Sequence, residues 1–169
     1  LKSTAAYADE LMQRHRPSGP RVAFLTGCLM ESMFREINFA TVRVLIENNV
    51  RVVIPEGQGC CGAFQEHTGL DGVEALRDQN RRAFGLLDAE AIVSNSSGCG
   101  YALGRTLHPD KEVIDVLGFL GELGPVQRQR DLNDTTRVYV DLPCHLVHGQ
   151  KAAGIPANVL DATGHRWEL

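Results

Sequence analysis

The apolar residues of the chain fall into short continuous runs that alternate with longer segments of helical spacing. Runs of four or five residues are typical of strands buried on both faces. They occur at residues 22–26, 50–54, 91–94 and 138–142. Apolar positions three and four residues apart predict helices within residues 1–16 and at 31–48, 71–87, 115–123 and 148–161. Strands that alternate with helices indicate βαβ units, so the sequence predicts an α/β fold with a parallel sheet and flanking helices.

Composition narrows the class of protein. A length of 169 residues suits one ordinary α/β domain, and 43% hydrophobic residues indicate a folded chain. A net charge of −4 argues against a nucleic-acid partner held by phosphate contacts. No apolar run approaches the roughly 20 residues of a membrane helix, and the N-terminal residues lack the apolar core of a signal peptide. We therefore expect a cytoplasmic protein without a transmembrane segment.

The order of the segments predicts three regions. Residues 1–20 form a helix and a Pro/Gly linker from an upstream region, and residues 21–134 form a first complete unit. Residues 135–169 begin a second, truncated unit, because strand, Cys144 and helix follow one another there as strand, Cys28 and helix do near the start. Because the chain does not begin with methionine, we expect it to be an internal piece of a longer protein.

The chain has five cysteines, an odd number that includes an adjacent pair, and this is a poor disulfide framework. In a chain without an export signal, metal binding or redox chemistry is the better hypothesis. Each cysteine position follows a predicted strand, in the order Cys28, Cys60 with Cys61, Cys99 and Cys144. Such loops share the carboxyl edge of a parallel sheet. We expect the sulfurs of the first four cysteines to lie together, and Cys144 to lie apart as the first ligand of a second site.

Several kinds of site remain possible for these thiols. A tetrahedral zinc ion would satisfy four sulfurs, but no C-x-x-C knuckle occurs, and adjacent cysteines reach one small ion poorly. An iron–sulfur cluster has several irons, and glycine-rich loops offer it close backbone N–H groups. The alternatives are inert buried cysteines, a structural zinc module, or a catalytic thiolate activated by His67 or His145.

A glycine motif and the histidines offer two further candidate sites, and neither is included in the predicted site. Gly57-x-Gly59-x-x-Gly62 matches a dinucleotide fingerprint, but two of its variable positions are cysteines. Residues 63–69 do not predict an immediate helix, and no acidic residue ends the next strand, so nucleotide binding is disfavoured. The six histidines are left out of the ligand set, although His145 and His148 flank Cys144.

The cysteine motifs resemble the cysteine-rich CCG domain that occurs in heterodisulfide reductase. The closer resemblance is to the glycolate oxidase (glycolate dehydrogenase) iron–sulfur subunit, and the lactate-utilisation iron–sulfur protein shares the layout. The resembling stretches are GCLM at 27–30, NFATVRVL at 38–45, PEGQGCCGA at 55–63, HTG at 67–69, Asn80 with Ala83 and Phe84, SGCG at 97–100, and PCHLVHGQ at 143–150.

The resemblance implies that residues 21–134 are a first CCG domain and residues 135–169 the start of a second. Cys28, Cys60, Cys61 and Cys99 match the ligands of the first motif, and Cys144 opens the second. The heterodisulfide-type motif ends in C-x-x-C, but its last position here is Ala102, so four ligands suit an ordinary 4Fe–4S cluster.

The function implied by the resemblance is electron transfer in a glycolate oxidase complex. This chain would carry electrons from flavin-containing subunits to a respiratory acceptor, with no catalytic residue of its own. The complex would lie in the cytoplasm or at the cytoplasmic face of the inner membrane. A heterodisulfide reductase-like or lactate-utilisation protein is the alternative. Aerobic handling would leave the cysteines of such a fragment empty or oxidised.

Overall fold

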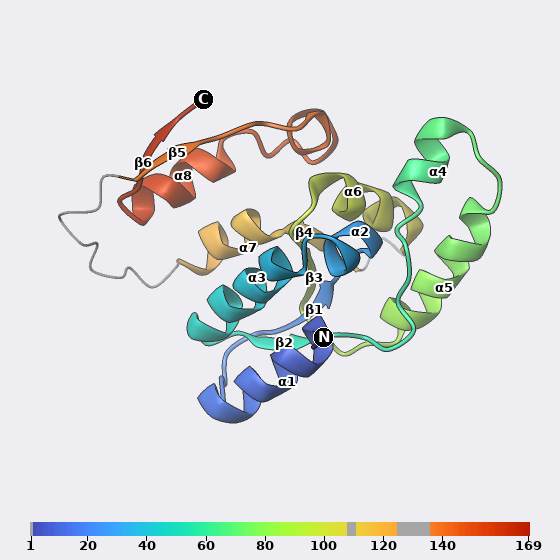
Figure 1. Cartoon of the computed structure of the whole chain (residues 1–169), viewed down its shortest axis with the longest axis horizontal. Coiled ribbons are helices and arrows are strands. Elements are labelled where there is room, and N and C mark those ends of the chain that lie inside the picture. Colours follow the sequence, from blue (N-terminus) through green and yellow to red (C-terminus); the bar gives the residue numbers. More distant parts are fainter. Residues whose placement is uncertain (1, 108–110, 125–135) are drawn as a thin grey trace.

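The computed structural model describes residues 2–107, 111–124 and 136–169. Its main sheet has four strands, all parallel, in the order β2-β1-β3-β4 (Figure 1). The strands are β1 (Arg21–Leu25), β2 (Arg51–Val53), β3 (Ala91–Ser94) and β4 (Val113–Asp115). The predicted α/β class with a parallel sheet and flanking helices is confirmed.

Helices flank both faces of this sheet. In chain order they are α1 (Thr4–His15), α2 (Cys28–Ser32), α3 (Arg35–Glu47), α4 (Ala63–Thr68), α5 (Val73–Gly85), α6 (Ser97–Thr106) and α7 (Val116–Leu123). Alternate residues of β1 enter opposite cores: Val22 and Phe24 pack with α1, α3 and α7, whereas Ala23 and Leu25 pack with α5 and α6. Burial on both faces explains why the strands read as unbroken apolar runs.

Several local expectations were wrong. The predicted helix 31–48 is two helices, α2 and α3, because the chain breaks at Met33 and Phe34. Residues 63–68 form α4, although no helix was expected directly after the glycine-rich loop. The short strand β4 was missed, because its three residues lie directly before the α7 helix.

Helix α6 was also missed, because its glycines lower helix propensity. In the structure two of these glycines allow close packing. A methyl group at Gly100 would lie 3.3 Å from Ser94 Cβ, and one at Gly104 would lie 3.7 Å from Val113 Cβ. Tertiary packing against β3 and β4 therefore outweighs local propensity here.

The C-terminal part forms a separate small βαβ unit. It contains β5 (Arg137–Tyr139), the π-helical turn η1 (His145–Gly149), α8 (Ile155–Ala162) and β6 (Arg166–Glu168). The strands β5 and β6 pair in parallel with each other, and not with the main sheet, so the expectation that all strands end at one shared edge was wrong for β5. Sequence patterns predict a strand but not the sheet that it joins.

This small unit repeats the beginning of the main one. Arg21 of β1 lies opposite Arg51 of β2, and Arg137 of β5 lies opposite Arg166 of β6, at nearly the same separation along the chain. Each first strand is followed by a cysteine and then a helical segment. The boundary predicted between residues 134 and 135 lies outside the described residues.

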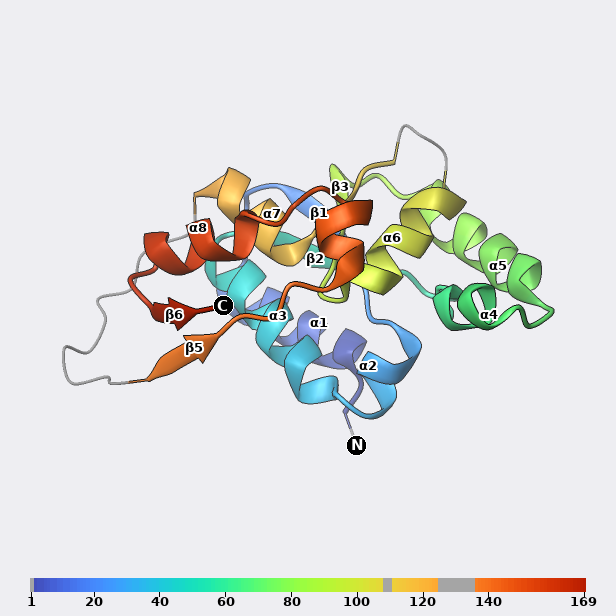
Figure 2. The ribbon, with the colours of Figure 1, turned by 90° about the horizontal axis from the view of Figure 1, so that it is seen from above.

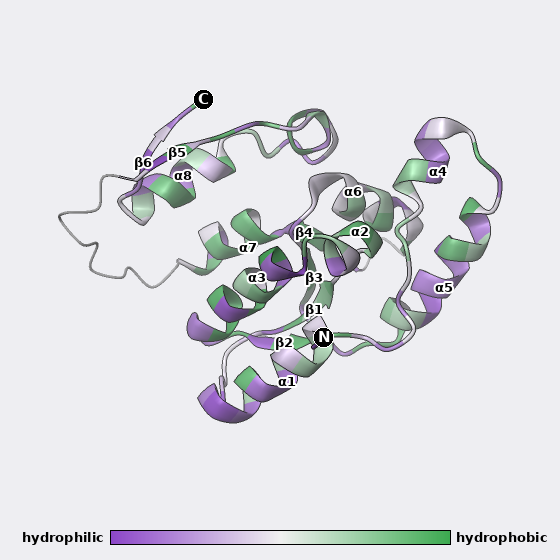
Figure 3. Cartoon of the chain, viewed as in Figure 1, coloured by the Kyte–Doolittle hydropathy of each residue, from purple (hydrophilic) through white to green (hydrophobic). Residues whose placement is uncertain are grey.

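Helix α7 joins the two units, and most of its residues are hydrophobic (Figure 3). One side packs on the main core, and the other faces α8 (Figure 2). A methyl group at Gly118 would come within 3.4 Å of Ile155, and one at Gly121 within 3.7 Å of Val159. None of the helices in the described ranges is long and apolar enough to cross a membrane.

Asp115 provides a pH-dependent test of this junction. It caps α7 by accepting a hydrogen bond from Leu117 N at 2.9 Å, and burial raises its pKa above the ordinary value of 3.8. The folded protein therefore holds the proton more tightly than the unfolded chain, and ionisation destabilises the fold as pH rises through this range. Asp115→Asn keeps the cap without the charge.

We expect the free energy of unfolding of Asp115→Asn, relative to the unchanged protein, to increase between about pH 4 and pH 7. Urea denaturation across this range measures it. A difference that does not vary with pH would show that Asp115 ionises equally in both states.

Candidate metal centre

Four cysteines lie at the carboxyl edge of three neighbouring strands. Cys28 begins α2 after β1, Cys60 and Cys61 lie between β2 and α4, and Cys99 lies in the first turn of α6 after β3. Because β2, β1 and β3 are adjacent in the sheet, their loops open side by side. The site is thus built from segments far apart in sequence.

The sulfurs of these cysteines approach one another in two pairs. The Cys28 and Cys60 Sγ atoms are 3.3 Å apart. The thiols of Cys61 and Cys99 lie close enough to shift each other's pKa in opposite directions. A methyl group at Gly27 would lie 4.0 Å from the Cys99 sulfur, which places the second pair beside the first. The expected position of these four cysteines at one edge of the sheet is confirmed, whereas their role as ligands stays a prediction.

The shared environment separates the proton affinities of these thiols. The hydrogen bond from Cys61 and one from Ser96 lower the pKa of Cys99 to about 6, against the opposing effect of burial. The same hydrogen bond, together with burial, raises the pKa of Cys61. Burial, and then the hydrogen bond with Cys60, raises the pKa of Cys28. Since the thiolate is the metal-binding form, the lowered pKa of Cys99 favours this thiol as a ligand.

Gln58 connects the loop after β2 to the end of β1. Its Oε1 accepts hydrogen bonds from Thr26 N at 2.9 Å and Thr26 Oγ1 at 3.1 Å. Its Nε2 donates to Phe24 O at 3.2 Å and to Pro55 O at 3.3 Å. This side chain therefore fixes the Cys60 loop relative to the Cys28 loop.

Asn80 of α5 holds the same loop from the other side. It is fully buried, accepts a hydrogen bond from Gly59 N at 3.0 Å and donates to Cys60 O at 2.8 Å. Asn80 was not predicted as a site residue, although an asparagine at an apolar helix position was a signal for a buried hydrogen bond. The loop ends at Gly62, which has a φ of +81°, and a methyl group there would lie 2.9 Å from Val73 Cγ2, so a side chain is disfavoured at this position.

A second asparagine network supports the Cys28 loop. Asn38, fully buried on α3, donates to Thr26 O at 2.9 Å and to the Glu31 carboxylate at 3.2 Å. Asn95, directly after β3, donates to Asn38 Oδ1 at 2.9 Å. Although partial burial raises the pKa of Glu31, hydrogen bonds from Thr4 and Asn38 outweigh it and lower that pKa. These contacts connect the loops after β1 and β3.

Cys144 lies in the small C-terminal unit. It is exposed and directly precedes η1. The following residue, His145, places its Nδ1 3.6 Å from the position of a methyl group on Gly98, next to Cys99. The Cys144 segment therefore lies against the first site, and whether Cys144 binds a metal stays a prediction.

The donor set fits an iron–sulfur cluster. Four cysteines lie at one sheet edge with glycine backbone beside them, and sulfur ligands are characteristic of such clusters. Among the described residues, no three His, Cys, Asp or Glu side chains are arranged as ligands of a single metal ion. A multi-iron cluster also accommodates adjacent cysteines, each reaching a different iron.

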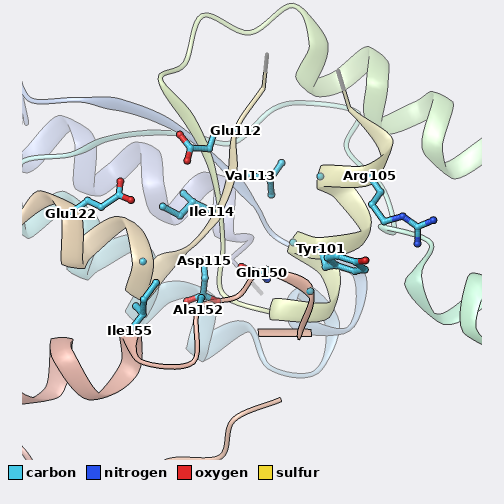
Figure 4. A pocket seen from close by; sticks show the side chains of 14 residues that line it. Tyr101, Arg105, Glu112, Val113, Ile114, Asp115, Glu122, Gln150, Ala152 and Ile155 are labelled. Carbon is cyan, nitrogen blue, oxygen red and sulfur yellow. The ribbon is translucent and has the colours of Figure 1, made fainter. Parts of the chain in front are cut away.

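Two cavities lie near this region. One of about 340 Å³ opens beside Cys28 and Cys60 and includes Ser32, Arg35 and Gln58 in its lining. Another, of about 400 Å³, lies between α6, β4, α7 and the segment after η1 (Figure 4). The lining of this second cavity contains no cysteine, whereas Cys28 and Cys60 line the first.

Comparison with known proteins agrees with this chemistry. The cysteine-rich domain model, CCG, matches residues 22–104. An uncharacterized iron–sulfur protein of Methanococcus maripaludis is 36% identical over 84% of this chain and 28% of its own length. A fumarate reductase (CoM/CoB) subunit of Methanothermobacter marburgensis is 35% identical over 85% of this chain and 29% of its own length.

A probable glycolate oxidase iron–sulfur subunit of Bacillus subtilis is 43% identical over 52% of this chain and 22% of its own length. The chain thus spans less than a third of the length of these relatives. No solved structure matches the chain. Residues 22–104, which carry Cys28, Cys60, Cys61 and Cys99, therefore belong to the cysteine-rich CCG domain family.

Proposed function

We propose that this chain is the electron-transfer part of a glycolate oxidase iron–sulfur subunit. The observation that carries the proposal is the convergence of four thiols at one sheet edge, in two close pairs. The iron–sulfur names of its relatives support the same chemistry. Cys28, Cys60, Cys61 and Cys99 would hold a 4Fe–4S cluster, which supplies one-electron chemistry when bound.

The residues of the chain determine how such a cluster would work. Gln58 and Asn80 fix the cysteine loops, so that the thiols require little reorganisation when the redox state changes. Cys28 is exposed while Cys61 is buried, so Cys28 marks the edge where electrons enter or leave. No residue here is assigned to the oxidation of a hydroxy acid.

The remaining parts of the proposal concern the whole protein. Residues 137–168 would be the first βαβ unit of a second cysteine-rich domain, with Cys144 as its first ligand, because they repeat the β1–β2 arrangement. Flavin-containing subunits would deliver electrons from glycolate, and a respiratory acceptor would receive them. The complex would be cytoplasmic and reach a membrane only through its partners.

A second candidate is direct disulfide reduction at the cluster. Two findings favour it: a cavity of about 340 Å³ opens beside Cys28 and Cys60, and one relative is named a fumarate reductase (CoM/CoB) subunit. Against it, the fifth cysteine position of the heterodisulfide-type motif is Ala102, a buried residue of α6. We therefore prefer a carrier to a catalyst.

The test uses the anaerobically reconstituted chain and electron paramagnetic resonance (EPR). We expect dithionite to produce the signal of a reduced cluster, glycolate alone to produce none, and an added disulfide to leave the dithionite signal unchanged. Rapid loss of the signal with disulfide would favour the reductase. Reduction by glycolate without flavin subunits would contradict the carrier assignment.

A further inference from the structure

Two histidines from different units meet beside the cysteine site. His67 lies on α4, shortly after Cys61, and His145 directly follows Cys144. Their Nε2 atoms are 3.3 Å apart, and their rings stack with centroids 4.9 Å apart and 21° between planes. The contact therefore connects the helix after the Cys60–Cys61 pair to the turn after Cys144.

The opposite side of the His145 ring faces the Cys99 turn. Its Nδ1 lies 3.6 Å from the methyl position of Gly98, and the ring of Tyr101 is 5.6 Å away. Gln150, the residue that follows η1, holds the end of this turn against α6, because its Nε2 donates to Ser97 O at 2.9 Å. The turn η1 therefore lies along the first turn of α6, beside Cys99 (Figure 2).

The partners of this contact are themselves held in place. Arg105 lies 5.8 Å from the ring centre of Tyr101, and its Nη1 binds the Glu66 carboxylate at 3.0 Å. Glu66 precedes His67 on α4 and also binds Arg77 of α5 at 3.2 Å. These ion pairs therefore connect α4, which carries His67, to α5 and α6.

We infer that His67 and His145 are positioning residues of the cysteine site. Their contact holds the segment after Cys144 against the loops of Cys61 and Cys99. This inference rests on the proposed function. Neither histidine touches the thiols in a described contact. Their effect is to hold two cysteine loops and η1 together and to limit the access of water to the site.

Loss of this contact should have two measurable effects on the reconstituted protein. Residues that support metal ligands typically contribute 10–100-fold to affinity, so we expect His145→Ala to lose its cluster in air about tenfold faster. Greater exposure to water favours the more negatively charged reduced state, so the midpoint potential should shift upward. Visible absorption and spectroelectrochemistry measure the two effects.

The matched control is His148→Ala, because His148 lies on the same turn but is exposed. It should leave lifetime and potential unchanged. His67→Ala should reproduce the effect of His145→Ala, and the double variant should be no worse than either single one, because both act through one contact. His145→Phe, which keeps only the stacking, should show an intermediate effect.

The outcomes separate this inference from the proposed function. If the unchanged chain takes up no iron and sulfide, the proposed function fails. If it forms a cluster whose lifetime and potential are the same in His67→Ala, His145→Ala and His148→Ala, the positioning role is wrong and the proposed function stands. Additive effects in the double variant would also overturn the single-contact account.

Discussion

Cys61→Ser is expected to lose most of its iron and sulfide on anaerobic reconstitution. Cys61 is the buried member of the adjacent pair, and its thiol interacts with that of Cys99. Serine is a poor ligand for iron in a sulfur site, and its hydroxyl cannot replace the thiolate there. The measurement is iron and acid-labile sulfide per chain, with circular dichroism to confirm that the variant folds.

Cys144→Ser is the matched control for this experiment. Cys144 is exposed and belongs to the small unit that pairs β5 with β6, so its loss should leave iron and sulfide content unchanged. Equal losses in both variants would mean that Cys144 is a ligand of the first site. Retention of a full cluster by Cys61→Ser would remove Cys61 from the ligand set.

The second large effect concerns Asn80. Asn80→Ala removes one donor and one acceptor from a fully buried position and leaves Gly59 N and Cys60 O without partners. The two groups are partly buried. A buried group left without a hydrogen bond costs about 1–3 kcal/mol, so we expect a loss of roughly 2–4 kcal/mol in the free energy of unfolding. Urea denaturation of the cluster-free protein measures this loss.

Gln79 is the neighbouring control. Its Nε2 donates to Gly57 O at 2.9 Å, in the same loop, but in an exposed hydrogen bond. Water replaces such a partner, so Gln79→Ala should cost less than about 1 kcal/mol. Similar losses for the two variants would show that Asn80 contributes no more than a surface hydrogen bond.

The main sheet was predictable where burial on both faces produces unbroken apolar runs, as in β1, β2 and β3. It was not predictable where an element is short or its helix propensity is low. The three residues of β4 carry no pattern of their own, and α6 is rich in glycine because Gly100 and Gly104 pack closely on neighbouring strands. These features depend on contacts between distant segments.

The candidate site was likewise predictable from the sequence only in part. Topology alone brings cysteines that follow parallel strands to one edge, and this placed Cys28, Cys60, Cys61 and Cys99 together. The hydrogen bonds of Gln58 and Asn80, and the meeting of His67 with His145, depend on how particular helices pack. No local pattern encodes such contacts, so only the structure reveals them.

The most direct test of the central claim is the elemental content of the unchanged chain after anaerobic reconstitution with iron, sulfide and zinc all present. A 4Fe–4S cluster on the four cysteines predicts equal amounts of iron and acid-labile sulfide, about four of each per chain. It also predicts an EPR signal in the reduced state. About one zinc per chain without sulfide would contradict it, because a closed zinc site of four sulfurs carries no electrons.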